Sequence, residues 1–147
     1  GVVVEGFDNT PIKFAKCCSP LPGDPIVGFI TRGFGVSIHK QSCVNAISSM
    51  KDPTNAPRWV KAYWADSVKD SYKAGIEIIA LNRNELLQDV LAALADIRVP
   101  IYAVNARQVE NNCAMVSLTI GINNTEHLNR VVARLSKVKD VLKVTRS

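Results

Sequence analysis

Apolar and polar positions change their spacing several times along this chain, and the changes predict its elements. In the first half, short apolar runs are separated by clusters of Gly, Pro, Asp and Asn, a pattern typical of short strands joined by turns. This pattern predicts strands over residues 2–4, 12–15, 26–31, 36–38 and 58–64. We expect one short helix over residues 41–50, and we expect the aromatic-rich strand over residues 58–64 to close the sheet.

The second half follows the order β-α-β-β-α-β. Its strands are expected over residues 74–81, 101–109, 113–122 and 141–145. Apolar residues recur at helical spacing over residues 86–97 and again over residues 128–135, which predicts two amphipathic helices. Asn84 and Thr125 are their expected N-caps. This order is typical of a ferredoxin-like fold, in which the helices cover one face of an antiparallel sheet.

Residues 65–70 are polar and lack any periodicity, and we place a domain boundary there. The predicted fold class is therefore α+β, with a small β-rich domain over residues 1–68 and a ferredoxin-like domain over residues 69–147. The length of 147 residues suits two small domains. The chain begins with Gly1 instead of Met, so we expect an excised fragment.

Composition narrows the functional classes. The apolar fraction of 47% is typical of globular proteins, and no apolar run approaches the ~20 residues that span a bilayer. We therefore expect no membrane partner, and cysteines that we predict to be unpaired indicate a reducing cytoplasm. The net charge of +5 divides into +2 before and +3 after residue 71, a mild and even balance that permits nucleic-acid contact without demanding it.

Soft metal ligands gather at the two ends of the predicted hairpin. Cys17 and Cys18 are adjacent, and His39 and Cys43 are four residues apart. Three thiolates and an imidazole are what a structural zinc site requires, and His39 and Cys43 would share one face of a helix that began near Lys40. Alternatively, the cysteines are small buried apolar residues and His39 is a surface residue. A disulfide is the weaker interpretation, because vicinal cysteines rarely bridge.

No catalytic motif accompanies these ligands. Gly33 and Gly35 lie in a predicted hairpin turn and do not form a nucleotide-binding loop. His127 lies just inside a predicted helix start without a nearby nucleophile, so we interpret it as a surface residue. Cys113 stands alone at a strand start and is expected in or near the core.

The string A-K-C-C-S-P-L-P-G-D-P-I-V-G-F-I-T-R-G-F-G-V-S-I-H-K-Q-S-C over residues 15–43 resembles the zinc-finger-like module of long RelA/SpoT homologues. These are the stringent-response enzymes that make and hydrolyse (p)ppGpp, and the module is also called the ribosome-intersubunit domain. In that family an ACT domain follows at the C-terminus, which agrees with the order of elements in the second half. The resemblance covers essentially the whole chain.

The resemblance implies a non-catalytic regulatory fragment of a GTP pyrophosphokinase, a (p)ppGpp hydrolase or an enzyme with both activities. Its implied partners are upstream catalytic domains and the ribosome, where the module docks on ribosomal RNA beside the A-site tRNA. Zinc is the one cofactor implied. The candidate RNA contacts are four cations and one aromatic ring: Lys13, Lys16, Arg32, Lys40 and Phe34. A solvated basic surface is the alternative.

ACT domains commonly bind amino acids at the loop after their first strand, so the resemblance implies a ligand site, for example for a branched-chain amino acid. The corresponding residues are Asn82, Arg83, Asn84 and Leu86. Asn82 stands where the family commonly has Asp, and Glu85 stands where it commonly has Gly, which removes a close backbone approach. A purely structural ACT domain is the alternative. Exposed sheet edges and a face free of helices also predict a homodimer through this domain.

Overall fold

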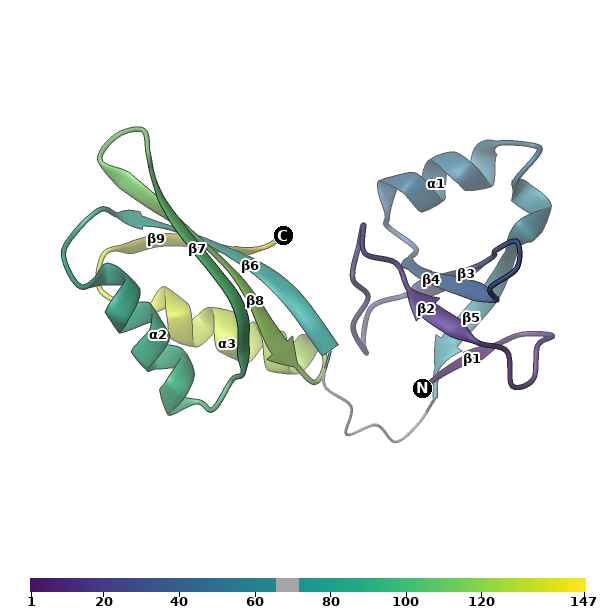
Figure 1. Cartoon of the computed structure of the whole chain (residues 1–147), viewed down its shortest axis with the longest axis horizontal. Helices are drawn as coiled ribbons and strands as arrows, with labels where there is room; N and C mark the ends of the chain where they lie inside the picture. Colours follow the sequence, from purple (N-terminus) through teal and green to yellow (C-terminus); the bar gives the residue numbers. More distant parts are fainter. Residues whose placement is uncertain (66–71) are drawn as a thin grey trace. The chain divides into compact units, whose positions relative to one another are not determined.

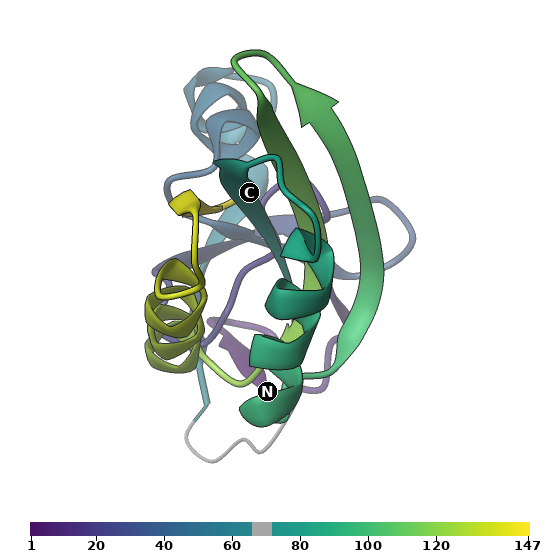
Figure 2. The same ribbon diagram turned by 90° about the vertical axis from the view of Figure 1, so that its left-hand side faces the viewer.

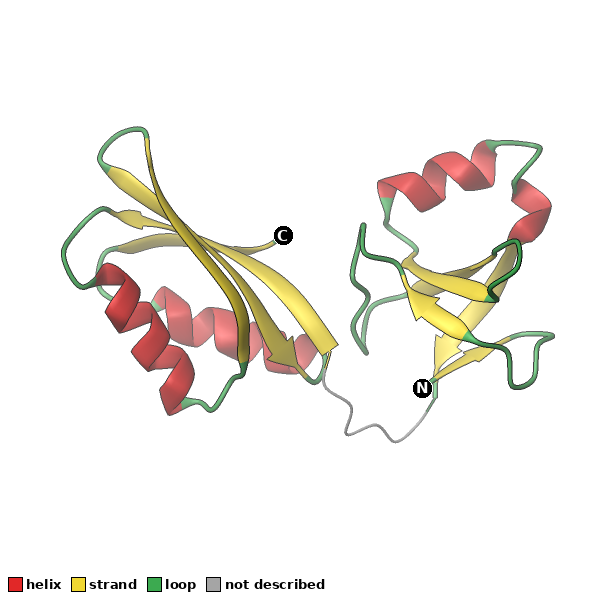
Figure 3. Ribbon diagram, in the orientation of Figure 1, coloured by secondary structure: helices red, strands yellow, loops and turns green. Residues whose placement is uncertain are grey.

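A computed structural model describes residues 1–65 and 72–147 and divides the chain into two units, residues 1–70 and 71–147. The boundary predicted between residues 68 and 69 lies outside the described residues. Both units combine a sheet with helices, which confirms the α+β class (Figure 3). Within the described ranges, no helix has the length and apolar character needed to cross a membrane.

The first unit is a five-stranded sheet with one α-helix (Figure 1). Its elements are β1 (Val2–Val4), β2 (Ile12–Phe14), β3 (Ile26–Ile30), β4 (Val36–Lys40), α1 (Val44–Lys51), the 3-10 helix η1 (Ala56–Arg58) and β5 (Trp59–Trp64). The strand order is β1-β5-β3-β4-β2, with β2 parallel to β4 and the other pairs antiparallel. The expectation that the last strand closes the sheet is wrong, because β5 lies between β1 and β3 and the very short β1 forms the edge.

Alternation along the strands builds the core of this unit. Val36 and Ile38 point to one face of β4 and are 1% and 0% exposed, whereas Ser37 and His39 point to the other face. The core is completed by Val4, Ile26 and Ala62, with partly buried Val2, Ile12, Phe14, Val60 and Trp64 packed against it. Burial of each aliphatic side chain contributes roughly 1.5–3 kcal/mol. This core holds β3 and β4 in a fixed register.

The hairpin between β3 and β4 confirms the predicted turn over residues 32–35. The N–H of Thr31 donates to the carbonyl of Gly35 at 2.8 Å, and the Thr31 hydroxyl closes the turn with two further hydrogen bonds to Gly35. Gly35 has a φ of +145°, and a Cβ there would collide with the backbone of Pro11. Glycine is therefore required at this position, both for its backbone angle and for the close approach.

The second unit has the predicted β-α-β-β-α-β order. Its elements are β6 (Tyr72–Leu81), α2 (Leu86–Asp96), β7 (Ile101–Val109), β8 (Cys113–Ile122), α3 (Thr125–Ser136) and β9 (Val141–Arg146). The strand order β7-β8-β6-β9 is antiparallel throughout. Both helices lie on the same face of this sheet (Figures 1 and 2). The ferredoxin-like prediction is confirmed.

Buried and half-buried residues alternate along β6 and β8 because only one face of each strand meets the helices. Ile76, Ile78, Ile120 and Leu94 are 0% exposed and form the centre of this core. Gly75, Glu77, Ser117 and Thr119 lie on the opposite face, away from the buried residues. The edge strand β7 differs, since residues 101–108 are all exposed.

The two predicted N-caps of this unit are wrong. Glu85 is the N-cap of α2, with a left-handed φ of 67°, and Asn84 lies one residue before it. Asn124 is the N-cap of α3, and its side-chain oxygen accepts the N–H of His127 at 2.7 Å. Asn124 and Thr125 are both good caps, and only the backbone geometry decides between such neighbours.

Candidate metal centre

The four predicted ligands are carried by three local structures that meet at one end of β4. Cys17 and Cys18 lie in a turn after β2, closed by a hydrogen bond from the Ser19 N–H to the Ala15 carbonyl (2.9 Å). The turn explains how adjacent cysteines reach one point, since their side chains would diverge in a strand. His39 lies in β4, and Cys43 is the N-cap of α1.

The expectation that His39 and Cys43 share a helical face is wrong. The helix begins only at Val44, so the two ligands lie on either side of a strand-to-helix junction. A hydrogen bond from the Cys43 N–H to the Lys40 carbonyl (3.0 Å) tightens this junction. The side chains of His39 and Cys43 are therefore brought together by the turn between β4 and α1, and not by a shared helical face.

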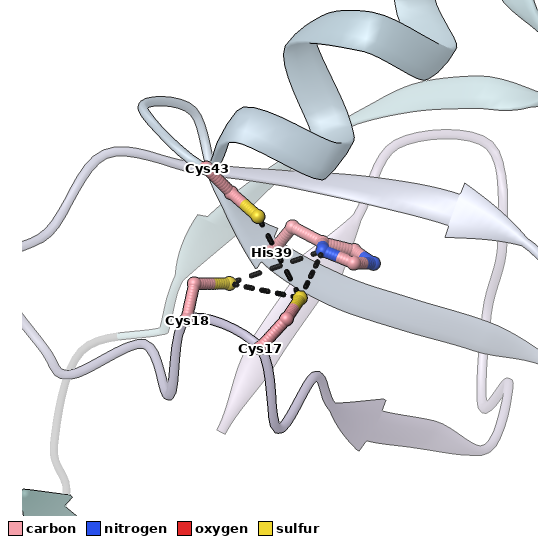
Figure 4. Close-up of side chains that lie close together, drawn as sticks. All are labelled: Cys17, Cys18, His39 and Cys43. Atoms are coloured by element: carbon pink, nitrogen blue, oxygen red, sulfur yellow. Dashed lines mark hydrogen bonds between the residues drawn. The ribbon is translucent and has the colours of Figure 1, made fainter.

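The ligand atoms converge closely (Figure 4). All four lie within 4.8 Å of one another, and the Cys17 Sγ lies 3.5 Å from His39 Nδ1, 3.6 Å from Cys43 Sγ and 4.0 Å from Cys18 Sγ. Tetrahedral zinc with Zn–S of about 2.3 Å and Zn–N of about 2.0–2.1 Å requires edges of about 3.8 Å between sulfurs and about 3.6 Å between sulfur and nitrogen. The cluster fits a tetrahedral metal ion, and in the described part of the chain no other such group is found.

The loop after the cysteine pair is firmly anchored. Leu21 is 0% exposed, and its N–H donates to the Asp24 carboxylate at 2.7 Å. The Trp64 indole N–H donates to the Asp24 carbonyl at 2.9 Å, which ties the loop to β5. The Pro-Gly-Asp segment thus fixes the turn that carries two of the four ligands.

The pKa values of the ligands are shifted in different directions. Burial raises the pKa of the Cys18 thiol to about 12, so a metal must displace its proton. Burial also raises the pKa of Cys43, but hydrogen bonds led by the Ala46 N–H outweigh it and the net shift is downward. Burial lowers the pKa of His39, which favours the neutral imidazole that a metal binds.

His39 is surrounded by residues that the sequence did not identify as part of the site. Its Nε2 lies 3.4 Å from the Ser37 hydroxyl oxygen, and its ring meets the Trp59 ring edge-on at 5.3 Å between centroids. The backbone N–H of Lys40 donates to Cys18 Sγ at 3.3 Å. The alternation of residues in β4 could have indicated Ser37, because it shares a face with His39. Trp59 lies in β5, and only the fold places it beside the His39 ring.

The predicted RNA contacts fall into two groups, one next to the metal ligands in the sequence and one around the Phe34 ring. Lys16 directly precedes Cys17 and Lys40 directly follows His39, so they flank the ligands. Lys13 and Phe34 lie together, with the Lys13 ammonium 5.9 Å from the centroid of the Phe34 ring. Phe34 is 51% exposed beside exposed Arg32 at the tip of the hairpin.

The loop predicted to bind an amino acid borders a hollow, and one of its side chains is already engaged within the protein. Asn82, Arg83 and Leu86 line a hollow of about 200 Å³ that extends to β7 and β8, and exposed Asn84 is not part of it. The Arg83 guanidinium forms ion pairs with Asp89 (2.8 Å) and Asp140 (3.0 Å). It also donates to the carbonyl of Lys139 at 3.0 Å.

Two families match this chain. Residues 2–65 match the family described as RelA/SpoT RIS domain, and residues 69–146 match the family described as ACT domain. A GTP pyrophosphokinase of Haemophilus influenzae is 35% identical over 99% of this chain. A bifunctional (p)ppGpp synthase/hydrolase RelA of Mycobacterium tuberculosis is 37% identical over the same share.

The chain spans 19% of the length of each of these relatives. Among solved structures, the ACT domain from the GTP pyrophosphokinase of Chlorobium tepidum covers 53% of this chain and all of its own length. Its sequence identity is 22% and its TM-score is 0.47.

Proposed function

Because the chain belongs to the RelA/SpoT family, with a RIS domain followed by an ACT domain, we propose that it is the regulatory C-terminal region of a stringent-response enzyme. In this proposal it has no catalytic activity of its own and acts in the cytoplasm. It couples the state of the ribosome to catalytic domains that lie upstream in the parent. The parent makes (p)ppGpp as a GTP pyrophosphokinase, hydrolyses it, or does both.

The observation that carries this proposal is the match of both families in order, over residues 2–65 and then over residues 69–146. The geometry of the first unit supports a binding role. The first unit combines a cluster of metal ligands and an anchored loop with a hairpin that presents the exposed Phe34 ring and the cation Arg32. Such a surface is suited to phosphate contacts and base stacking.

Cys17, Cys18, His39 and Cys43 would hold a structural zinc ion, which ties the turn after β2 to the junction between β4 and α1. Elemental analysis should find about one zinc per chain, and chelation should destabilise the first unit. Cys17→Ser combined with Cys18→Ser should reproduce the effect of chelation. Purified protein without zinc that loses no stability on chelation would show that this cluster has no metal-binding role.

Ribosomal RNA would bind through Lys13, Lys16, Arg32 and Lys40, with Phe34 stacking on a base. Removing one phosphate-binding side chain should lower the slope of log affinity against log salt by about one. Arg32→Ala should therefore weaken binding most at low salt. Phe34→Ala should cost a similar increment at every salt concentration, roughly 1–3 kcal/mol, because stacking does not depend on counterions.

Ribosome co-sedimentation across a salt series measures both effects, and Lys51→Ala provides a matched control, since this lysine is exposed at the end of α1 and is not among the predicted contacts. Unchanged binding after all four basic substitutions would assign ribosome binding to another surface, such as the ACT domain.

An amino-acid-sensing ACT domain is the second candidate, because Asn82, Arg83 and Leu86 line a hollow at the expected loop. It predicts saturable thermal stabilisation by a branched-chain amino acid. Arg83 already uses its guanidinium within the protein, which favours the structural interpretation. A thermal-shift panel of amino acids distinguishes the two.

A further inference from the structure

The imidazole of His39 has two nitrogen atoms, and the fold presents them to different surroundings. Nδ1 faces the cysteines, 3.5 Å from Cys17 Sγ and 3.8 Å from Cys18 Sγ (Figure 4). Nε2 faces the Ser37 hydroxyl oxygen at 3.4 Å. A histidine that binds a metal through one nitrogen usually donates the N–H of the other to an oxygen, which fixes the tautomer and the ring orientation.

Ser37 reaches this position because of the strand. Residues 37 and 39 alternate onto the same face of β4, while Val36 and Ile38 point into the core. Both strands beside β4 are paired with it, so the backbone of Ser37 is held on each side. The hydroxyl therefore lies at a fixed place beside the imidazole.

Trp59 holds the ring from another direction. Its ring meets that of His39 at 5.3 Å, and its indole N–H donates to the Ser49 hydroxyl at 3.0 Å. Ser49 belongs to α1, the helix whose N-cap is the ligand Cys43. Trp59 thus contacts the ligand in β4 and the helix that carries another ligand. Phe29 supports it from β3, with ring centroids 4.8 Å apart.

We propose that Ser37 and Trp59 are positioning residues of the metal centre. The Ser37 hydroxyl oxygen accepts a hydrogen bond from the Nε2–H of His39, which leaves the Nδ1 lone pair for the metal. Trp59 sets the position of α1, and with it Cys43, relative to the His39 ring. This inference rests on the proposed zinc site and specifies how that site selects one nitrogen.

The tautomer of His39 is the first readout, because a general loss of stability would not change which ring nitrogen carries the proton. Long-range ¹H–¹⁵N spectra of the full 147-residue chain report which nitrogen carries the proton and which one binds Zn²⁺. The chain contains two histidines, so His127→Gln assigns the signals. We expect protonated Nε2 and zinc on Nδ1. In Ser37→Ala this preference should disappear, whereas Ser37→Thr keeps the hydroxyl and should restore it.

Zinc affinity, measured by competition with a chromophoric chelator, gives the second readout. Ser37→Ala should weaken binding about tenfold or more, the usual effect of removing a group that orients a ligand. Trp59→Phe and its matched partner Ser49→Ala should each weaken zinc binding by a similar factor of about five, since both remove the hydrogen bond from the Trp59 indole to the Ser49 hydroxyl. Ser48→Ala, exposed on the same helix, should have no effect. Absorption spectra of the Co²⁺-loaded chain should shift in Ser37→Ala and not in Ser48→Ala.

Zinc on Nε2 in the unsubstituted chain would overturn the role of Ser37, and unchanged affinity in both Trp59→Phe and Ser49→Ala would overturn that of Trp59. If the chain binds no zinc, the proposed metal centre fails. The metal-free spectrum still tests the Ser37 contact in that case, because it too should show the proton on Nε2.

Discussion

Glu85 has a backbone angle that is unusual for a residue with a side chain. Its φ of 67° lies in the left-handed region, and its side chain makes no capping hydrogen bond to α2. A left-handed backbone conformation costs a residue with a Cβ roughly 1–2 kcal/mol. Glycine avoids this cost, but the gain is partly offset because glycine loses more conformational entropy on folding. We therefore predict that Glu85→Gly stabilises the second unit by about 0.5–1 kcal/mol.

Hydrogen exchange of the amides in α2 and β6 measures this change within the second unit. Ala92→Gly is the matched control, because residue 92 is exposed within α2 and has helical geometry. That substitution should destabilise the unit by about 1 kcal/mol. A loss of stability in both variants would mean that Glu85 makes compensating interactions.

His127 has a structural role that its place in the sequence did not reveal. Its Nδ1 accepts the Asn123 N–H at 3.0 Å, while its own N–H donates to the Asn124 side chain at 2.7 Å. It thus resembles the Glu or Gln of a capping box, with a titratable acceptor. Protonation of Nδ1 removes the acceptor.

Burial, with a smaller contribution from the charge of Arg130, lowers the pKa of His127 below its usual 6.5. The unfolded chain therefore binds this proton more readily than the folded chain. The stability from the neutral imidazole is complete above pH about 6.5 and is lost as the pH falls through the lower folded-state pKa. Glutamine at this position keeps an acceptor that does not titrate. We predict that between pH 7 and 5 the free energy of unfolding falls by about 1 kcal/mol less in His127→Gln than in the unsubstituted chain. Urea unfolding of both at each pH measures the difference, and identical pH profiles would contradict the prediction.

At the scale of elements, Arg83 connects two loops that are far apart in the sequence. From the turn after β6 it contacts Asp89 in α2 and both Lys139 and Asp140 before β9. Its side chain is 21% exposed, so each contact is only partly screened. We predict that Arg83→Met lowers the free energy of unfolding of the second unit by about 1–2 kcal/mol.

Arg83→Lys should recover little, because an ammonium group cannot reach three partners with the planar geometry of a guanidinium. Arg134→Met is the matched control. The ion pair of Arg134 with Asp96 is longer, 3.6 Å, and more exposed, so its removal should have almost no effect. Thermal unfolding followed by hydrogen exchange in β9 gives the comparison.

The elements that the sequence predicted well are those fixed by a repeated pattern. The β-α-β-β-α-β order and the hairpin at Gly33 and Gly35 follow from spacing and residue type. The four soft ligands were identified by residue type, whereas the turns that bring them together were not predicted. The predicted N-caps and the closing strand were wrong, because each depended on one residue or on long-range pairing. Trp59 and Arg83 make contacts between distant parts of the chain, and no local pattern encodes such contacts.

At the scale of the whole molecule, the edge strand β7 is suited to pairing with a partner strand. Among the described strands, β7 pairs with β8 alone, and eight of its nine residues, from Ile101 to Gln108, are exposed. Tyr102 and Val104 are 52% and 41% exposed. A long edge strand without proline or lysine is a template for pairing with another strand, and an antiparallel pair of identical strands satisfies two-fold symmetry.

We predict that the chain forms a homodimer in which two β7 strands pair and join the ACT sheets. Light scattering across a concentration series should show a mass that rises toward twice 16.0 kDa. Val104→Lys should shift the equilibrium to monomer, because the two-fold axis brings two added charges close together. Leu142→Lys is the matched control, since residue 142 is 59% exposed in β9, the opposite edge. A dimer that survives Val104→Lys and dissociates with Leu142→Lys would place the interface at β9, and a monomer at every concentration would leave the β7 edge unpaired.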